Sequence, residues 1–354
     1  MKFYERITLP ILHSLEPEIA HNLSIMALKS NLIPGPGPGK LTSDRLTVNI
    51  LGLNFPNPIG LAAGYDKNAK IIPQLMRIGF GFIEVGAVTP KPQSGNPNPR
   101  LFRLNEDLAI INRLGFNNLG MNKINKRLTL YSGAGIVGLN IGANKDSINR
   151  SNDYSEVLLH TYKSIDFATI NISSPNTKDL RNLQKTSSLR KLLKSLLETR
   201  ANIPKKIPLF LKVAPDLTKS DIKMITDLVL QFDIDGIITT NTTLERENLR
   251  SKYKDELGGL SGRPLFIKST KILAQFSKET RGQVPLIGVG GISSAEDAYI
   301  KIKAGASIVQ LYSALIYNGF SLVEKILSEL EQIIKDDGYK NVSEAIGIEK
   351  EKWL

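Results

Sequence analysis

The chain lacks cysteine entirely and has only three histidines among its 354 residues: His13, His21 and His160. Without thiols there can be no disulfide, no thiolate nucleophile and no cysteine-ligated zinc or iron–sulfur centre. The histidines are too scattered along the chain to suggest a metal site, and we expect none. Any base or nucleophile must therefore be Ser, Thr, Tyr, Lys, Asp or Glu.

Long apolar runs are missing as well. No uninterrupted apolar stretch reaches the roughly 18 residues that suggest a membrane span, and the N-terminus shows no apolar core followed by a small-residue cleavage site. We therefore expect neither a transmembrane helix nor export. The composition, 41% hydrophobic and 23% charged, is that of a globular protein. The length exceeds the roughly 250 residues of a typical barrel and leaves room for one large domain with an appendage.

The formal net charge of +12 raises the question of a polyanionic partner. The basic residues are nevertheless spread along the chain, and pairs such as Arg190-Lys191 and Lys205-Lys206 are short. This pattern favours a solvated basic surface, with a preference for anionic ligands or anionic lipid as the alternative. We expect no nucleic-acid partner.

Alternating Pro and Gly over 34–39 mark the clearest boundary, because neither helix nor strand can form there. We assign 1–40 to a helical appendage with its linker and 41–354 to the main domain. In the appendage, Pro10 interrupts a first apolar stripe and is expected to start a new turn, whereas Pro17 suits the first turn of a second helix. The two stripes could pack on the main domain, lie on a membrane surface, or do both.

Beyond the linker, short apolar runs alternate with amphipathic stretches. The eight runs are Pro58–Ala63, Phe82–Gly86, Ile136–Ile141, Phe167–Ile172, Leu209–Val213, Gly236–Thr239, Leu286–Val289 and Ser307–Leu311. The amphipathic stretches include Ser187–Glu198, Lys219–Leu230, Leu265–Phe276 and Ala295–Lys303. This alternation predicts parallel strands, and eight units predict an α/β fold, a closed (β/α)₈ or TIM barrel with a small N-terminal helical appendage. Part of the long interval Thr89–Ser132 is expected to cover the barrel mouth.

Polar residues and glycines follow nearly every predicted strand, where a barrel places its active site. Gly290-Gly291 after the seventh strand and Tyr312-Ser313 after the eighth suit a phosphate held by backbone amides. Amide and hydroxyl side chains cluster at 112–118, 171–177 and 239–243, and such neutral groups match the edges of a planar, amide-rich ring. Each cluster alone could be a polar turn, but three at strand ends indicate a binding site.

Two lysines stand out at the same end of the barrel. Lys67 follows the first strand, and Lys212 lies inside the apolar fifth strand. Burying a lysine is unfavourable unless it faces an anion or an electron-rich acceptor, although its ammonium could also reach the barrel rim. A positive charge near the pyrimidine end of a flavin would stabilise the reduced form.

Taken together, these motifs resemble one family, dihydroorotate dehydrogenase, in its membrane-associated, quinone-using class. The resemblance covers essentially the whole chain and is carried by Gly64–Lys67, Thr89–Arg103, Asn112–Asn118, Asn171–Thr177, Gly258–Pro264 and Gly288–Ile292. It implies oxidation of dihydroorotate to orotate in pyrimidine synthesis, with FMN as cofactor and a quinone as electron acceptor. It also implies a monomer peripherally bound at the cytoplasmic face of the membrane.

The resemblance assigns roles by position, with Ser174 as the base that takes the C5 proton while hydride leaves C6 for FMN. The substrate would be held by Lys67, Asn112, Arg113, Leu114, Gly115, Phe116, Asn171, Asn176, Asn241 and Thr242. FMN would be held by Ala63, Gly64, Tyr65, Asp66, Lys67, Ala87, Asn140, Asn171, Lys212, Thr240, Gly262, Gly291, Tyr312 and Ser313. His21 and Arg103 would line the quinone tunnel.

The absent cysteine agrees with this class, because soluble members of the family use a cysteine base and the quinone-using class a serine. Serine is a weak base, so we expect its proton to leave through a water or threonine relay. Ala87 departs from the Thr or Ser that related sequences often carry near the flavin; a backbone contact would survive this change, but a hydroxyl contact would not.

Three other interpretations are open to the sequence alone. A flavin barrel acting on RNA, such as a dihydrouridine synthase, would suit the positive charge, but those enzymes carry a cysteine acid and an RNA-binding domain. A phosphate-binding aldolase or synthase would use Lys212 as a Schiff-base amine. A membrane-bound scaffold would explain the appendage but would leave the polar strand ends without a purpose.

Overall fold

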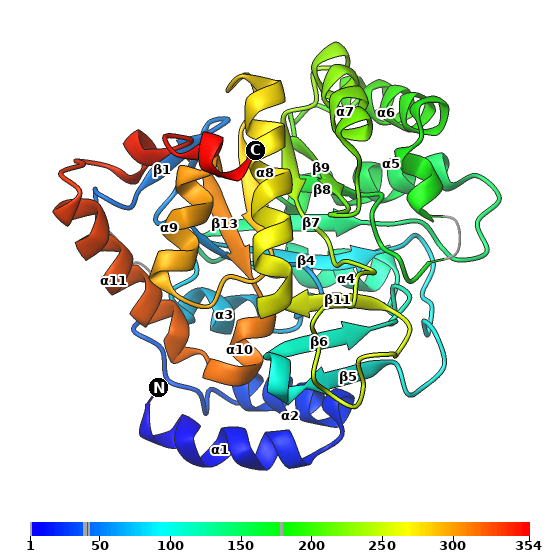
Figure 1. The fold of residues 1–354 in the computed structure, drawn as a ribbon. Helices are drawn as coiled ribbons and strands as arrows, with labels where there is room; N and C mark the ends of the chain where they lie inside the picture. The colour runs from blue at the N-terminus through cyan, green and yellow to red at the C-terminus, as the bar shows by residue number, and fades with distance from the viewer. Residues whose placement is uncertain (1, 38–40, 42, 178–179) are drawn as a thin grey trace.

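The computed structural model describes residues 2–37, 41, 43–177 and 180–354, and it shows eight parallel strands closed into a barrel (Figure 1). The strands are β3 (Ile59–Leu61), β4 (Phe82–Val88), β7 (Ile136–Ile141), β8 (Phe167–Asn171), β9 (Leu209–Val213), β10 (Gly236–Thr239), β12 (Leu286–Val289) and β13 (Ile308–Leu311). Neighbours around the barrel follow chain order, and β13 pairs with β3 to close it. Each of the eight predicted runs overlaps one barrel strand, so the predicted (β/α)₈ fold is confirmed.

Helices cover the outside of the barrel (Figure 1). The helices are α3 (Ile72–Ile78), α4 (Met121–Thr129), α5 (Arg150–Thr161), α6 (Thr186–Ala201), α7 (Lys219–Gln231), α8 (Phe266–Thr280), α9 (Ala295–Lys303), α10 (Ser313–Asn318) and α11 (Ser321–Asp336). Short 3₁₀ segments are Asn105–Asp107, Tyr162–Ser164, Leu180–Gln184, Arg263–Leu265, Val342–Ala345 and Lys350–Trp353. The four predicted amphipathic stretches correspond to α6, α7, α8 and α9. The side chains of Thr218 and Ser294 cap the first turns of α7 and α9.

Aromatic side chains fill one end of the barrel. The hairpin of β1 (Val48–Ile50) and β2 (Leu53–Phe55) brings Phe55 against Phe82, with ring centroids 5.2 Å apart. The edge-to-face series continues to Phe167 and Phe210 at centroid distances of 6.2 and 5.4 Å. A Cβ on Gly138 would lie 2.1 Å from the Phe167 ring, so the small residue is needed for this packing. A filled end leaves the carboxyl ends of the strands as the place for a cavity.

A small antiparallel sheet lies across those carboxyl ends. It consists of β5 (Leu101–Leu104), β6 (Ala109–Asn112) and β11 (Gly259–Gly262). The sheet confirms that part of 89–132 covers the mouth, but β11 and its pairing with β6 were not predicted. Gly259 pairs with Asn112 across 147 residues of chain, and no local pattern reports such a partner.

The appendage consists of α1 (Phe3–Ser14) and α2 (Pro17–Lys29), which lie beside β5 and α10 (Figure 1). Pro17 occupies the first turn of α2, as predicted. The expectation for Pro10 was wrong, because α1 continues through it. Pro10 and Arg6 are both exposed, so water can satisfy the Arg6 carbonyl that loses its helical partner.

The linker has neither helix nor strand over 33–37, as its Pro–Gly pattern predicts, and residues 38–40 lie outside the described part of the chain. It packs on the end of α3, where the Gly37 amide donates to the Arg77 carbonyl at 3.1 Å. The division at residue 40 stays a prediction.

One face of the appendage packs on the barrel while the other is open. Leu28 and Ile25 are buried, and the Glu5 carboxylate, also buried, accepts from the Ser321 amide at 2.8 Å. The opposite face presents large apolar side chains, which we call the appendage stripe: Phe3, Ile7, Ile11, Ile19, Leu23 and Met26. In the described part of the chain, no helix is long and apolar enough to cross a bilayer.

Candidate functional site

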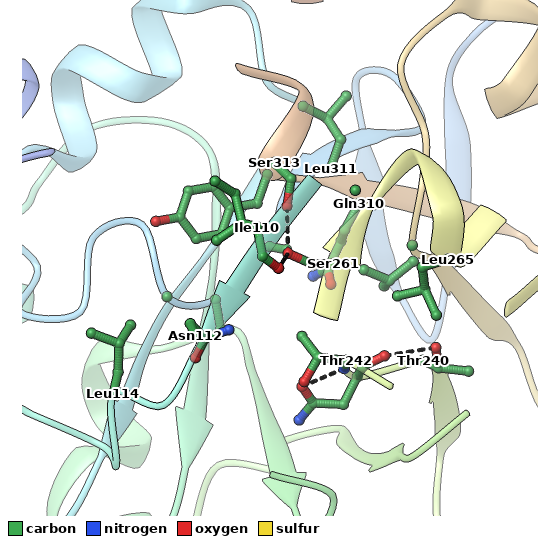
Figure 2. A pocket seen from close by; sticks show the side chains of 18 of the residues that line it. Ile110, Asn112, Leu114, Thr240, Thr242, Ser261, Leu265, Gln310, Leu311 and Ser313 are labelled. Carbon is green, nitrogen blue, oxygen red and sulfur yellow. Dashed lines mark hydrogen bonds between the residues drawn. The ribbon is translucent and has the colours of Figure 1, made fainter. Parts of the chain in front are cut away.

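A cavity opens at the carboxyl ends of the barrel strands, beneath the β5–β6–β11 sheet (Figure 2). Predicted site residues that line it are Ala63, Gly64, Lys67, Ala87, Asn112, Leu114, Gly115, Phe116, Asn140, Asn171, Ser174, Asn176, Lys212, Thr240, Asn241, Thr242, Gly262, Gly291, Tyr312 and Ser313. Parallel strands deliver their carboxyl ends to one face, so residues distant in sequence meet there. Five predicted residues do not line the cavity: Tyr65, Asp66, Arg113, His21 and Arg103.

A hydrogen-bonded network crosses the barrel interior below the cavity. The Glu84 carboxylate accepts from Gln310 Nε2 and from Asn140 Nδ2, both at 2.6 Å. Asn140 Oδ1 in turn accepts from Asn171 Nδ2 at 2.8 Å. Glu84 is fully buried, and the two amides share its charge through charge-assisted bonds. The network fixes which amide atoms face the cavity and which are already hydrogen-bonded within the protein.

The network continues to the strand ends that would face a substrate. Asn241 Nδ2 donates to Ser173 Oγ at 3.0 Å and lies 3.3 Å from Asn171 Oδ1. On the other side of the cavity, Asn176 Nδ2 donates to Asn112 Oδ1 at 3.0 Å. Amides from β6 and from the segments after β8 and β10 therefore surround one small volume, as their spacing in the sequence predicts.

Ser174 lies at the edge of this amide group. Its side chain is buried, and its Oγ accepts a 3.3 Å hydrogen bond from the Asn176 amide. No described histidine lines the cavity with it. Thr177 Oγ1, three residues further on, is buried without a hydrogen-bond partner among the described residues. Thr177 itself does not line the cavity.

Lys67 and Lys212 both line the cavity, and among the described residues neither ammonium lies within ion-pair distance of a carboxylate. Lys212 is only 5% exposed. Burial lowers the pKa of Lys67 to about 8, although the Glu18 carboxylate opposes this shift. Two lysine ammonium groups that line a cavity without a direct ion-pair partner indicate anionic or electron-rich ligands.

The turn after β12 has the shape of an anion cradle. Gly290 and Gly291 have φ of +115° and +80°, and a Cβ on Gly291 would lie 2.5 Å from that of Phe266. Ser313 follows β13 and donates to Ser261 Oγ at 2.8 Å (Figure 2). Only glycine fits the double turn, which leaves backbone amides accessible from the cavity.

The cavity also contains polar atoms that lack protein partners. Among the described residues, Gln310 Oε1, Thr242 Oγ1 and Asn117 Oδ1 are buried in its lining without a hydrogen bond. Buried polar groups are normally paired, so these acceptors and hydroxyls indicate a bound polar ligand. With the two lysines and the glycine turn, they fit a planar heterocycle that carries a phosphate, as FMN does.

Tyr65, Asp66 and Arg113 lie behind the lining. Tyr65 Oη shares a 2.7 Å hydrogen bond with Ser24 Oγ, and its ring packs edge-on against Tyr312. Asp66 accepts from the backbone amides of Lys70 and Ile71, just before α3. Arg113 forms a 2.7 Å ion pair with Glu256. The side chains support the segments that line the cavity.

The two residues predicted for a quinone tunnel lie at the appendage. The His21 ring packs edge-on against Tyr65, with centroids 5.0 Å apart, and burial together with the Lys67 charge lowers its pKa to about 3. Arg103 donates to the His13 carbonyl at 2.8 Å and so ties β5 to the end of α1. A neutral histidine suits an apolar passage better than a charged one.

The family-model comparison supplies the identification. The sequence model of the family described as "Dihydroorotate dehydrogenase" matches residues 45–334. The chain belongs to the dihydroorotate dehydrogenase family. Its relatives include the "Dihydroorotate dehydrogenase (quinone)" of Cereibacter sphaeroides, 52% identical over 100% of both chains. That of Bartonella tribocorum is 48% identical over 100% of this chain and 99% of its own.

A solved structure shows the same fold. The DHODH of Eimeria tenella, in complex with ferulenol, superposes with a TM-score of 0.90 at 40% identity, covering 96% of this chain and 98% of that one. The two members of the dihydroorotate dehydrogenase family are thus compared over nearly their full lengths. The family membership replaces the RNA-modifying, aldolase and scaffold interpretations of the sequence.

Several lining residues of this dihydroorotate dehydrogenase were not predicted. The polar ones are Ser261, Arg263, Ser293, Gln310 and Asn318. The apolar ones include Leu101, Leu108, Ile110, Ile316 and Tyr317. Gln310 could have been found, because a polar side chain in a predicted barrel strand is unusual. The apolar residues carry no such signal, since in sequence they resemble ordinary core positions.

Proposed function

We propose that the chain oxidises dihydroorotate to orotate in pyrimidine synthesis, with FMN in the barrel cavity and a membrane quinone as the final electron acceptor. The family supports the reaction, and the "(quinone)" in the relatives' names supports the acceptor. One observation of the structure carries the proposal: Ser174, the two lysines and the glycine turn line one cavity. Because described residues of one chain supply this whole constellation, a monomer would suffice.

The amide cluster suits the substrate. Dihydroorotate presents an amide-rich ring and a carboxylate, and the amides of Asn112, Asn171, Asn176 and Asn241 supply both donors and acceptors around it. Lys67 would face the carboxylate, and Thr242 would use the hydroxyl that lacks a partner. Leu114, Gly115 and Phe116 line the same end.

The remaining lining suits FMN, which when bound accepts the hydride from C6 of the substrate. Lys212 would contribute its positive charge at the buried end, beside the Asn140 amide and Thr240. Gly291, Tyr312 and Ser313 would offer the phosphate site. The other residues proposed to hold it are Ala63, Gly64, Ala87, Asn171 and Gly262. Tyr65 and Asp66 would hold the segment after β3 in place.

Ser174 would take the C5 proton. Its Oγ is buried beside the amide cluster and bonds only weakly to the Asn176 amide, so a lone pair is available to the substrate. No described histidine lines the cavity, so we expect the proton to pass to a hydroxyl or to water. The Thr177 hydroxyl is buried without a partner among the described residues but does not line the cavity, so a water would have to join it to Ser174 if it serves as the relay.

One spectrum tests the reaction. The purified protein should carry flavin absorbance that anaerobic dihydroorotate bleaches and a short-chain quinone restores, without any nicotinamide nucleotide. Each step uses the protein's own chromophore, so no coupled assay intervenes. A colourless protein, or a flavin that dihydroorotate does not bleach, would contradict the proposal.

We further propose that the chain is a peripheral protein at the cytoplasmic face of the membrane. The appendage stripe supports this, because Phe3, Ile7 and Ile11 are 78%, 52% and 58% exposed on one helix. An exposed apolar face on an amphipathic helix inserts into the boundary between headgroups and acyl chains. We propose that an apolar quinone would then enter from the membrane at the contact between the appendage and β5, where His21 and Arg103 lie.

Replacing Phe3, Ile7 and Ile11 together by serine should release the protein from lipid. Each lost side chain removes about 1.5 kcal/mol or more of apolar transfer energy if buried, so binding to phosphatidylcholine vesicles should fall at least about 10²-fold. Flotation with vesicles measures this, and bleaching by dihydroorotate should not change. The control is Leu130→Ser with Ile148→Ser, two exposed apolar residues outside the appendage. Equal loss in both variants would refute the assignment of the stripe.

A further inference from the structure

One ion pair joins the appendage to the segment over the substrate end of the cavity. Glu18, in the first turn of α2, pairs in bidentate fashion with Arg100: Nη2 lies 2.6 Å from Oε1 and Nε 3.0 Å from Oε2. The two side chains are only 12% and 23% exposed, Arg100 being the more buried. Partial burial and two parallel bonds make this pair stronger and more directional than a surface pair.

Arg100 ends the segment between β4 and β5 (residues 89–100), and it also shapes that segment. Its Nη1 donates to the carbonyls of Ser94 and Asn96 at 2.6 and 2.8 Å. The guanidinium thus binds Glu18 through Nε and Nη2, and its Nη1 holds the 89–100 segment in a turn. Because the fork is planar, the position of the carboxylate fixes the position of the turn.

Asn96 links this turn to the side-chain amides that we propose bind the substrate. Its Nδ2 donates to the Arg113 carbonyl at 2.9 Å and to the Asn176 carbonyl at 3.0 Å. The Asn176 side chain donates in turn to Asn112 Oδ1. A continuous hydrogen-bonded path therefore runs from α2 to the two amides that face the substrate.

The polar side chains that anchor α1 and its N-terminal cap contact α10 and α11 instead. Lys2 pairs with Glu324 at 2.7 Å, and Glu5 binds Ser321, both in α11. His13 Nε2 lies 2.8 Å from the Ile316 carbonyl in α10. These contacts hold the appendage on the barrel without touching the 89–100 segment. The molecule thus offers a matched comparison between an anchor that reaches the substrate end and one that does not.

We propose that Glu18 and Arg100 are positioning residues for dihydroorotate, so that the appendage governs the first half-reaction as well as access of the quinone. This inference rests on the function proposed above. Glu18 holds Arg100, Arg100 holds the 89–100 segment, and Asn96 holds Asn176 and the Arg113 backbone at the distance that the substrate requires. An appendage that shifts on the membrane would then change substrate affinity.

The pair also acts on Lys67 through its charges. Glu18 and Asp66 raise the pKa of Lys67, whereas burial, Arg100 and Lys70 lower it, and His21 faces it as a neutral ring. Removing the carboxylate of Glu18 should lower that pKa further, and removing the guanidinium of Arg100 should raise it. Two variants that break the same bond should thus move the alkaline limit of ligand binding in opposite directions.

The test measures orotate binding and anaerobic flavin reduction, neither of which needs a quinone. Glu18→Gln and Arg100→Gln should each weaken orotate binding about tenfold at neutral pH, and the double variant should be little worse than either single one. Orotate is titrated by its effect on the flavin spectrum. The pH above which orotate binding fails should fall in Glu18→Gln and rise in Arg100→Gln. Glu324→Gln, which breaks the Lys2 anchor, should match the wild type throughout.

Three results would overturn the inference: additive effects in the double variant, equal losses in Glu18→Gln and Glu324→Gln, or a change confined to the KM for quinone. If Glu18→Gln binds no flavin, Glu18→Asp replaces it; a shorter carboxylate should weaken orotate binding, and wild-type affinity would refute the role. A wild-type flavin that dihydroorotate fails to bleach would instead refute the proposed function.

Discussion

Ser174→Ala should slow flavin reduction by dihydroorotate about 10²- to 10⁴-fold, the range that general base catalysis contributes. The methyl group cannot accept the C5 proton, and in the described part of the chain no histidine lines the cavity to replace the hydroxyl. FMN content and orotate affinity should stay near the wild-type values, because among the described residues the Ser174 side chain makes a single hydrogen bond, which is long. Anaerobic stopped-flow bleaching at saturating dihydroorotate measures the effect.

The neighbouring hydroxyl provides the control for Ser174. Ser173 bonds to the Asn171 and Asn241 amides and does not line the cavity among the described residues. Ser173→Ala should therefore weaken substrate binding without a large change in the rate at saturation. If Ser174→Ala bleaches at nearly the normal rate, Ser174 is not the base.

Lys212→Met should weaken FMN binding at least roughly 30-fold, because removing one partner of a buried charged contact costs about 2 kcal/mol or more. The variant should also lower the midpoint potential of the cofactor that remains bound, since a positive charge favours the reduced state. The stability of the FMN-free protein should change in the opposite direction from the affinity for FMN. Lys212 is buried without a carboxylate partner, so methionine should raise the unfolding temperature of the FMN-free chain.

A loss of FMN affinity together with a gain in apoprotein stability is specific for a buried lysine at the cofactor site. Lys206→Met removes the same charge from an exposed site at the other end of β9 and should change neither property. Fluorescence titration gives the affinity for FMN, and thermal unfolding of the stripped protein gives the stability. A Lys212→Met variant that binds FMN normally would place the lysine outside the cofactor site.

The chemistry of the cavity was largely predictable because strand ends are local features. The amide clusters at 112–118, 171–177 and 239–243 each follow one apolar run, and a parallel barrel must bring them to one face. Lys212 was recognisable for the same reason, as a charge inside an apolar strand. The lack of cysteine was enough to exclude a thiol base.

The β5–β6–β11 sheet over the cavity, and the contacts that position it, could not be predicted from local sequence features. β6 pairs with β11 across 147 residues, and the Glu18–Arg100 contact joins residues 82 positions apart. Neither pairing leaves a periodic trace, because periodicity reports only which face of an element is buried. The same limit explains Pro10, whose place within α1 depends on solvent reaching the Arg6 carbonyl.

By itself, the sequence determined the barrel, the polar strand ends that meet at its mouth and the absence of thiol chemistry, because each follows from residue type and short-range spacing. Only the tertiary structure decided which polar atoms are already paired and which face the cavity. Gln310 and Glu84, and the amide of Asn140, meet through bonds between different strands. Hydrogen bonds between distant segments depend on three-dimensional placement, and this is the information that residue order does not display.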